Sequence, residues 1–264
     1  MMHILPRHLA PYRLVVIVVL LVAGLPAAAS AEDTGAAQAA GSPPAPHAVP
    51  TPKAVVELFT SQGCSSCPPA DKLLGELAQR PDVLALTMAV DYWDYLGWKD
   101  TLAKHGHSLR QKGYAKVRGD GKMFTPQAIL NGSTMAVGND EDALDGALAA
   151  VAAPHVPVAI STKDGKLAVK VGAGTGRAEV WICPVASDVT VKIGRGENEG
   201  STMTYHNVVR GWTRLGEWTG GEAHFEARLD ELRADTIDSV AVLVQSGTQA
   251  NPGPILGAAL APLP

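Results

Sequence analysis

Apolar residues mark two strands and one helix at the start of the folded part of the chain. Two apolar runs of strand length cover residues 55–59 and 83–90. Between them, apolar side chains recur at helical spacing, which predicts a helix over about 64–79. Two strands joined by a helical crossover of this length run parallel, with a right-handed connection. The pattern therefore predicts a β-α-β unit.

A second helix, a hairpin and a third helix follow this unit. Residues 98–117 are predicted to be helical, although two glycines weaken the pattern. Asn131-Gly132 separates two apolar runs, and this pair favours a tight hairpin because both residues accept positive φ. A last helix is predicted over residues 139–153, capped by its first or second residue and with an acidic first turn. The predicted order of elements is βαβαββα.

The pattern changes after Pro154. Short stretches of alternating apolar and polar residues, such as 166–171, are separated by turn sequences, with almost no helical periodicity. This predicts an antiparallel, β-rich domain over residues 155–264, built as a sandwich. Residues 32–53 are rich in Ala, Gly, Pro and Ser and are predicted to be a flexible linker. A chain of 264 residues has room for two such domains, 54–153 and 155–264.

Residues 1–31 have the composition of a secretory signal peptide. Basic residues precede an apolar run from Leu14 to Leu25, and Ala29-Ser30-Ala31 is a small-x-small cleavage site. The run is shorter than the ~20 residues that a membrane span needs, so we expect cleavage, with an uncleaved anchor as the alternative. A periplasmic or secreted protein with no membrane span after cleavage is therefore predicted.

Charge and cysteine content narrow the functions to consider. The net charge is −4 at pH 7, so there is no basic excess to hold phosphates, and nucleic acid is not an expected partner. The chain has three cysteines. Outside the cytosol disulfides persist, and their exchange is a normal activity there.

Cys64 and Cys67 carry the strongest chemical signal. They are separated by two residues, directly after the first predicted strand and at the start of the predicted helix. The free amides and the dipole of a helix N-terminus favour an anion, so we expect Cys64 to be an exposed thiolate nucleophile and Cys67 to be the resolving thiol. Half of a zinc site is the alternative, but it needs a second Cys/His pair at suitable spacing. The pattern favours redox chemistry, with no metal site and no cofactor.

Two further positions are candidates for the same chemistry. Thr125-Pro126 directly precedes the strand that leads into the hairpin. We expect this bond to be cis and to face the dithiol, with the backbone of Thr125 free to pair with an extended substrate. Glu57 lies in the first strand. If it is buried beneath Cys67 it can take the proton of the resolving thiol, and otherwise it is a solvated residue on the strand face.

The sequence around the cysteines resembles a known family. Residues 56–71 (VELFTSQGCSSCPPAD) are similar to the characteristic segment of an exported bacterial thioredoxin-like family of unknown function. The resemblance extends over nearly all of 54–264 and implies a thioredoxin-like fold followed by a family-specific C-terminal part, with no settled substrate. The chain departs from thioredoxin itself in the Ser-Ser dipeptide, in having no Trp before Cys64, and in one extra residue between the strand acid and that cysteine. The dipeptide sets redox poise, so oxidant and reductant both stay open.

Two tryptophans and one polar loop are candidate recognition elements. Trp93 and Trp98 follow the second strand at the sheet edge where the dithiol lies, and ligands of open α/β sheets bind at that edge. Packing around the inserted helix is the alternative for both. In the C-terminal part, residues 195–200 form a polar loop between strands. If this loop carries recognition, Glu197 or Arg195 should contact the region of the dithiol; the alternative is a solvated hairpin.

Three functions agree with these residues. The first is a thiol-disulfide oxidoreductase, in which Cys64 forms a mixed disulfide with a protein partner and Cys67 resolves it. The second is a binding protein that holds a soft metal such as Cu(I) on the dithiol. The third is a purely structural bridge, with the function in the β-rich domain. Cys183 lies in an apolar segment and is expected to be a buried, inert thiol. We favour the first, although fold alone does not decide among them.

Overall fold

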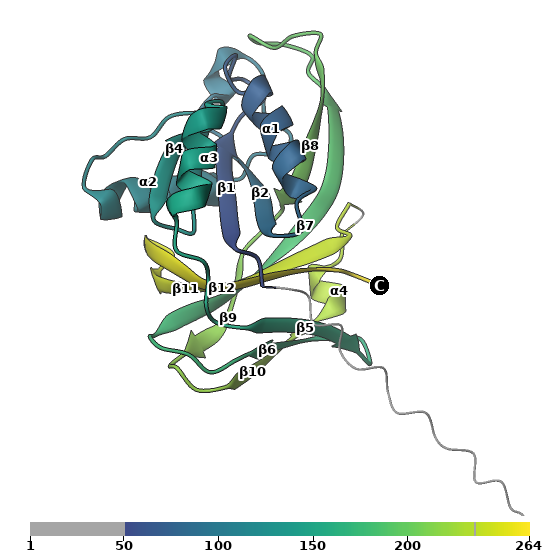
Figure 1. Cartoon of the computed structure of the whole chain (residues 1–264). Coiled ribbons are helices and arrows are strands. Elements are labelled where there is room, and N and C mark those ends of the chain that lie inside the picture. The colour runs from purple at the N-terminus through teal and green to yellow at the C-terminus, as the bar shows by residue number, and fades with distance from the viewer. Residues whose placement is uncertain (1–50, 235) are drawn as a thin grey trace, which may run out of the picture. The chain divides into compact units, whose positions relative to one another are not determined.

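The computed structural model describes residues 51–234 and 236–264 (Figure 1). The predicted signal peptide and most of the predicted linker, up to residue 50, lie outside the described residues. The described residues belong to one compact unit. No helix among them is both long and apolar enough to cross a membrane.

The first part of the chain alternates strands and helices. In chain order its elements are β1 (Ala54–Thr60), α1 (Pro68–Ala78), β2 (Val83–Ala89), the 3₁₀ helix η1 (Asp94–Leu96), α2 (His105–Arg118), β3 (Gln127–Leu130), β4 (Thr134–Val137) and α3 (Glu141–Ala150). β1 and β2 run parallel, as the crossover pattern predicts. On its other side β1 pairs antiparallel with β3, and β3 pairs antiparallel with β4.

Two helices begin later than their periodicity predicts. α1 begins at Pro68 rather than near Cys64, because the residues before it form consecutive turns and two prolines occupy the first helical positions. α2 begins at His105, since the residues from Trp98 to Lys104 are not helical.

The structure contains both the turn residues predicted for the hairpin and the cap predicted for the third helix. Asn131 and Gly132 both have positive φ, within a three-residue connection from β3 to β4. The side chain of Asp140 caps α3 and accepts a hydrogen bond from the backbone N–H of Ala143 at 3.0 Å.

The second part of the chain is mostly strands. Its elements are β5 (Val158–Lys163), β6 (Lys166–Val171), β7 (Ala178–Lys192), β8 (Thr202–Val209), β9 (Thr213–Trp218), β10 (Ala223–Arg228), the short helix α4 (Leu229–Leu232), β11 (Ser239–Thr248) and β12 (Asn251–Pro262). β5, β6 and β10 form a separate three-stranded sheet. The other strands of this part join the sheet that β1 to β4 begin (Figure 1).

The main sheet runs without a break from one part of the chain into the other. Its strand order is β12-β11-β7-β8-β2-β1-β3-β4, with β9 paired to β7 outside this path. At the junction, β2 and β8 pair in parallel through Thr87 and Val208. The Thr87 hydroxyl also donates to the carbonyl of His206 at 2.6 Å, and the Asn207 side chain donates to the carbonyl of Ala85 at 3.0 Å. The boundary near residue 154 stays a sequence-based prediction.

Apolar clusters on the two faces of β1 bury different residues. Val56 and Leu58 pack with α1 and α3, whereas Val55 and Phe59 pack with Tyr114 of α2 and with strands of the second part. Side chains alternate along a strand, so the face of each β1 residue decides which of these environments it enters.

Candidate functional site

The disulfide between Cys64 and Cys67 lies in the turns that join β1 to α1. The backbone N–H of Cys64 donates to the carbonyl of Ser61 at 3.2 Å, and that of Cys67 donates to the carbonyl of Cys64 at 3.1 Å. Cys67 is the N-cap residue of α1. Cys64 is only 2% exposed and Cys67 is 0% exposed. The expectation that Cys64 presents an exposed sulfur is therefore wrong for the disulfide form.

Residues 193–201, between β7 and β8, cover the disulfide and are called the hairpin tip below. In Figure 1 the tip lies at the same end of the sheet as the start of α1. The Asn198 side-chain amide donates to the carbonyls of Gln62 and Cys64, both at 2.9 Å. A Glu197 carboxylate oxygen accepts a hydrogen bond from the backbone N–H of Ser65 at 3.2 Å. The prediction that Glu197 reaches the region of the dithiol is confirmed, and these contacts explain why Cys64 is buried.

Thr125, Pro126 and Trp93 lie beside the disulfide loop. The Thr125-Pro126 peptide bond is cis, as predicted. The Ser66 hydroxyl reaches the carbonyl of Thr125 at 3.5 Å, and the indole N–H of Trp93 donates to the Thr125 hydroxyl at 2.8 Å. Pro126 is buried, whereas Thr125 and Trp93 are half-buried. Part of the Thr125 backbone is thus next to the dithiol, where the sequence places it.

Trp98 joins the disulfide loop to the hairpin tip. Its indole N–H donates to the Gln62 side-chain oxygen at 2.7 Å. Its ring packs so closely against Gly194 that a Cβ added there would stand 2.9 Å from it. Both contacts are internal, so the packing alternative describes Trp98 in this structure better than a substrate-binding role.

Glu57 is buried, but it faces away from α1. Val56 and Leu58 point toward α1, so Glu57 shares the opposite face of β1 with Phe59. Arg110 donates through Nε and Nη2 to its two oxygens at 2.6 and 3.0 Å, and the Tyr114 hydroxyl donates at 2.5 Å. The structure does not bring Glu57 to Cys67. One extra residue between the strand acid and Cys64 explains this, because a shift of one position exchanges the two faces of a strand.

Arg110 is held by several buried partners besides Glu57. The Gln245 side-chain oxygen and the Tyr114 hydroxyl also lie 2.8 Å from the Arg110 Nη2 and share the two N–H groups of that nitrogen with Glu57, and the guanidinium lies 4.2 Å from the ring centre of Trp212. Burial acts to lower the pKa of Arg110, but the charges of Glu57 and Tyr114 and the hydrogen bonds to Glu57 together raise that pKa above its ordinary value. Arg110 therefore keeps its charge beside Glu57.

Asp71 is a candidate that the sequence-based analysis did not single out. It lies in the first turn of α1 and is 2% exposed, and neither carboxyl oxygen has a hydrogen-bond partner among the described residues. Burial raises the pKa of Asp71 to about 8; the nearby Thr60 hydroxyl, which falls short of hydrogen-bond geometry, acts in the opposite direction, and the charge of Asp100 raises the pKa further. The sequence feature that could have identified Asp71 is its position four residues after Cys67. Acids in a first helical turn are common because they complement the helix dipole, so the signal was weak.

Cys183 lies in β7, within the apolar cluster that Phe59 and Leu86 also enter, and is 0% exposed. Burial raises the pKa of its thiol far above the ordinary value. The prediction that Cys183 is a buried small residue is confirmed, and a thiol of this kind is a poor nucleophile.

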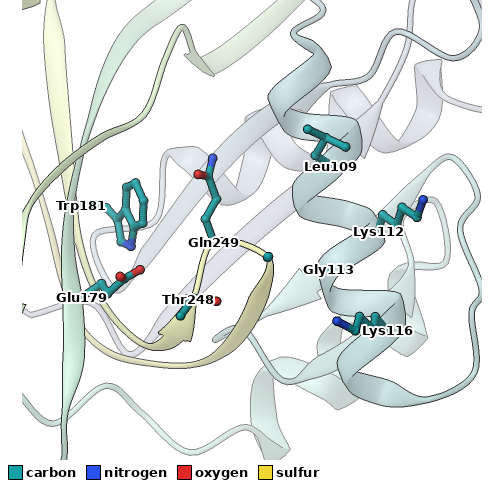
Figure 2. Close-up of a pocket in the computed structure, with 9 residues that line it drawn as sticks. Leu109, Lys112, Gly113, Lys116, Glu179, Trp181, Thr248 and Gln249 are labelled. Carbon is teal, nitrogen blue, oxygen red and sulfur yellow. The ribbon is translucent and has the colours of Figure 1, made fainter.

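A cavity of about 540 Å³ lies apart from the disulfide, between α2 and the turn from β11 to β12 (Figure 2). Its lining residues are Leu109, Lys112, Gly113, Lys116, Glu179, Trp181, Thr248, Gln249 and Ala250. None of the predicted site residues lines it. Within residues 51–234 and 236–264, no group of three or more His, Cys, Asp or Glu side chains could hold a metal ion.

These features define a mixed α/β protein, mostly sheet, with a buried CxxC disulfide before a helix. The chain belongs to the DUF1223 family, described as proteins of unknown function, whose model matches residues 55–245. The crystal structure of protein AGR_C_4864 from Agrobacterium tumefaciens, a structural genomics target, is similar at 36% identity with a TM-score of 0.70. That match covers 79% of this chain and 93% of the other.

A more distant likeness concerns the fold alone. HBP35 of Porphyromonas gingivalis is 13% identical, with a TM-score of 0.52, over 81% of this chain and 76% of the other. No curated protein matches the sequence. The comparisons therefore give this chain a family but no activity.

Proposed function

We propose that this chain is an exported, thioredoxin-like thiol-disulfide oxidoreductase that acts on protein thiols or disulfides through Cys64 and Cys67. The observation that carries the proposal is the place of the disulfide, between the end of β1 and the first turn of α1, with the Thr125 backbone beside it. The strand and helix order of residues 54–150 supports the thioredoxin-like assignment.

The reaction of the reduced form takes two steps. The Cys64 thiolate attacks a substrate disulfide, so that a Cys64–substrate bond forms and one substrate sulfur leaves as a thiolate. Cys67 then gives up its proton and attacks the Cys64 sulfur, which releases the second substrate thiolate. Each released thiolate takes a proton. The dithiol is oxidised by two electrons and the substrate disulfide is reduced by two; the reverse sequence oxidises a substrate dithiol.

Access to the sulfurs depends on the hairpin tip. Ser65 and Ser66 are exposed, whereas both cysteines are buried. A substrate must reach Cys64, whose carbonyl accepts a hydrogen bond from Asn198 of the tip. The proposal therefore includes a displacement of the tip when a partner disulfide approaches.

A trapping experiment tests the proposal. Cys67→Ala in the full chain should accumulate mixed disulfides through Cys64, because attack still occurs while the resolving thiol is missing. The matched control is the double variant Cys64→Ala/Cys67→Ala, which should trap nothing. Adducts are sought in extracts of the export compartment by non-reducing electrophoresis and mass spectrometry.

The reduction potential separates the remaining functions. Structural disulfides have potentials below roughly −300 mV, and an exchanging pair should lie above this. A lower value, with no adducts at any redox setting, contradicts the enzyme and favours a structural bridge. Absence of adducts together with tight Cu(I) binding by the reduced pair would favour the metal-binding alternative.

A further inference from the structure

A cluster of buried polar groups lies near the disulfide on the α1 side of β1. Thr60 ends β1, Asp71 lies in α1 and Tyr205 lies in β8, and each is at most 2% exposed. The Thr60 hydroxyl, both Asp71 oxygens and the Tyr205 hydroxyl have no hydrogen-bond partner within the described part of the chain. Unpaired buried polar groups cost free energy, so this cluster needs an explanation other than stability.

The position of Asp71 relative to Cys67 follows from helix geometry. The backbone N–H of Asp71 donates to the carbonyl of Cys67 at 3.0 Å, which makes the two residues neighbours at i and i+4. Such residues share one helix face, with Cβ atoms roughly 5–6 Å apart. Helical side chains lean toward the N-terminus, so the Asp71 carboxyl leans toward the turn that holds Cys67.

The charged neighbours of Asp71 do not neutralise it. From the segment after η1 comes Asp100, another acid, which accepts hydrogen bonds from the backbone N–H groups of Gln62, Leu102 and Ala103. Two residues of β8 also face α1. Tyr205 lies by Asp71, and the ring of His206 packs one helical turn further along, against Gly75, and pairs with Asp188. Burial and the charges of Asp71 and Asp100 raise the pKa of Tyr205. Among the described residues no side chain donates to either Asp71 oxygen, and burial without a donor favours the protonated carboxyl.

We propose that Asp71 accepts the proton of the Cys67 thiol when the mixed disulfide is resolved, and returns a proton to Cys67 when the disulfide is reduced. This inference rests on the proposed function. It gives Asp71 the role that the sequence pattern suggests for Glu57, which faces Arg110 instead.

The step balances. The S–H bond of Cys67 breaks and its proton passes to the Asp71 carboxylate, directly or through one water. The Cys67 sulfur forms a bond to the Cys64 sulfur, the bond between Cys64 and the substrate sulfur breaks, and the substrate thiolate leaves and is protonated by solvent. Because its pKa is raised to about 8, the Asp71 carboxylate is a stronger base toward a thiol than an ordinary carboxylate.

The test uses the full-length reduced protein and glutathione disulfide. Quenched samples are analysed by mass, which separates formation of the Cys64–glutathione mixed disulfide from its resolution by Cys67. For Asp71→Asn we expect formation within twofold of wild type and resolution at least tenfold slower at pH 8. The difference should shrink toward pH 10, where hydroxide can take the proton in place of Asp71. Glu76→Gln, an exposed acid on the same helix, is the matched control and should change neither step.

Thr60→Val is a second variant that keeps the carboxyl. The Thr60 hydroxyl faces Asp71 without meeting hydrogen-bond geometry in this structure, but it can donate to the ionised carboxylate once that forms, so its loss should move the midpoint of the resolution profile to higher pH. Resolution by Asp71→Asn at the wild-type rate with the wild-type pH profile would overturn the role of Asp71 and leave the exchange activity standing. No mixed disulfide in the wild-type protein would instead remove the proposed function, and the role of Asp71 with it.

Discussion

Two buried acids, Glu57 and Asp71, lie on opposite sides of β1 and differ in their hydrogen bonding. Glu57 has hydrogen bonds at both oxygens and a guanidinium beside it, whereas Asp71 has no hydrogen-bond partner within the described residues. A paired buried charge is held in place and cannot change its protonation cheaply. An unpaired buried carboxyl can gain and lose a proton near neutral pH. The comparison therefore favours a structural role for Glu57 in β1 and a role in proton transfer for Asp71 in α1.

The Glu57 side of this comparison also joins the two parts of the chain. Arg110 lies in α2, Glu57 in β1 and Gln245 in β11, and their hydrogen bonds close one buried network. Because this network spans residues far apart in sequence, it ties the C-terminal strands to the sheet that carries the disulfide.

The largest expected effect comes from breaking this network. Arg110→Met leaves the Glu57 charge buried without its partner, which should lower the free energy of unfolding by about 3–5 kcal/mol. Urea denaturation of the oxidised protein measures it. Arg214→Met, which breaks an exposed ion pair with Glu179, is the control and should cost about 0–1 kcal/mol.

The double variant Glu57→Met/Arg110→Met sharpens the same point. If the loss comes from an unpaired charge, removing both charges should restore most of the stability. A double variant as unstable as the single one would show that packing, and not charge, makes the network important.

The second effect is a pH dependence that belongs to Asp71. Its pKa is raised in the folded state to about 8 from an ordinary 3.8, so the unfolded chain ionises first as the pH rises. Stability should fall between about pH 4 and pH 8 and then level off, and Asp71→Asn should abolish this fall. Denaturation curves of both proteins across that range measure it. Parallel curves would mean that Asp71 is already ionised at low pH.

A smaller effect should follow from loosening the hairpin tip. Asn198→Ala leaves the carbonyls of Gln62 and Cys64 without their donor and should cost about 1–2 kcal/mol. Because the tip covers Cys64, dithiothreitol should reduce the disulfide several-fold faster. Asn139→Ala, which removes a longer hydrogen bond to the Ser66 carbonyl at 3.4 Å on the exposed side, is the control. Equal reduction rates in all three proteins would show that the tip does not limit access.

The smallest effect is expected at Cys183. Its thiol is fully buried in the apolar core, whereas Cys64 becomes accessible when the hairpin tip is displaced, so iodoacetamide should label Cys64 in the native reduced protein and leave Cys183 unlabelled. Cys183→Ala should lower stability by about 1 kcal/mol, through a small cavity, and leave the exchange rate within twofold. Fast labelling of Cys183 in the folded protein would contradict its assignment as an inert residue.

The sequence alone was enough for the local features of the site. Hydrophobic periodicity predicted β1, α1 and the parallel β2, and turn chemistry predicted the β3–β4 hairpin. The sequence also predicted the pairing of Cys64 with Cys67 and the cis Thr125-Pro126 bond. Each of these depends on residues close together in the chain or on strand order, which a pattern of apolar positions records.

Only the tertiary structure decided which groups are available for chemistry. Cys64 lies beneath the hairpin tip, whose Asn198 is 134 residues away in sequence and donates to the Cys64 carbonyl. Glu57 is paired with Arg110, 53 residues away. The absence of a partner at Asp71 within the described residues depends on what β1, β8 and the segment after η1 place around it. Burial and pairing are sums over such long-range neighbours, and no local pattern of residues encodes them.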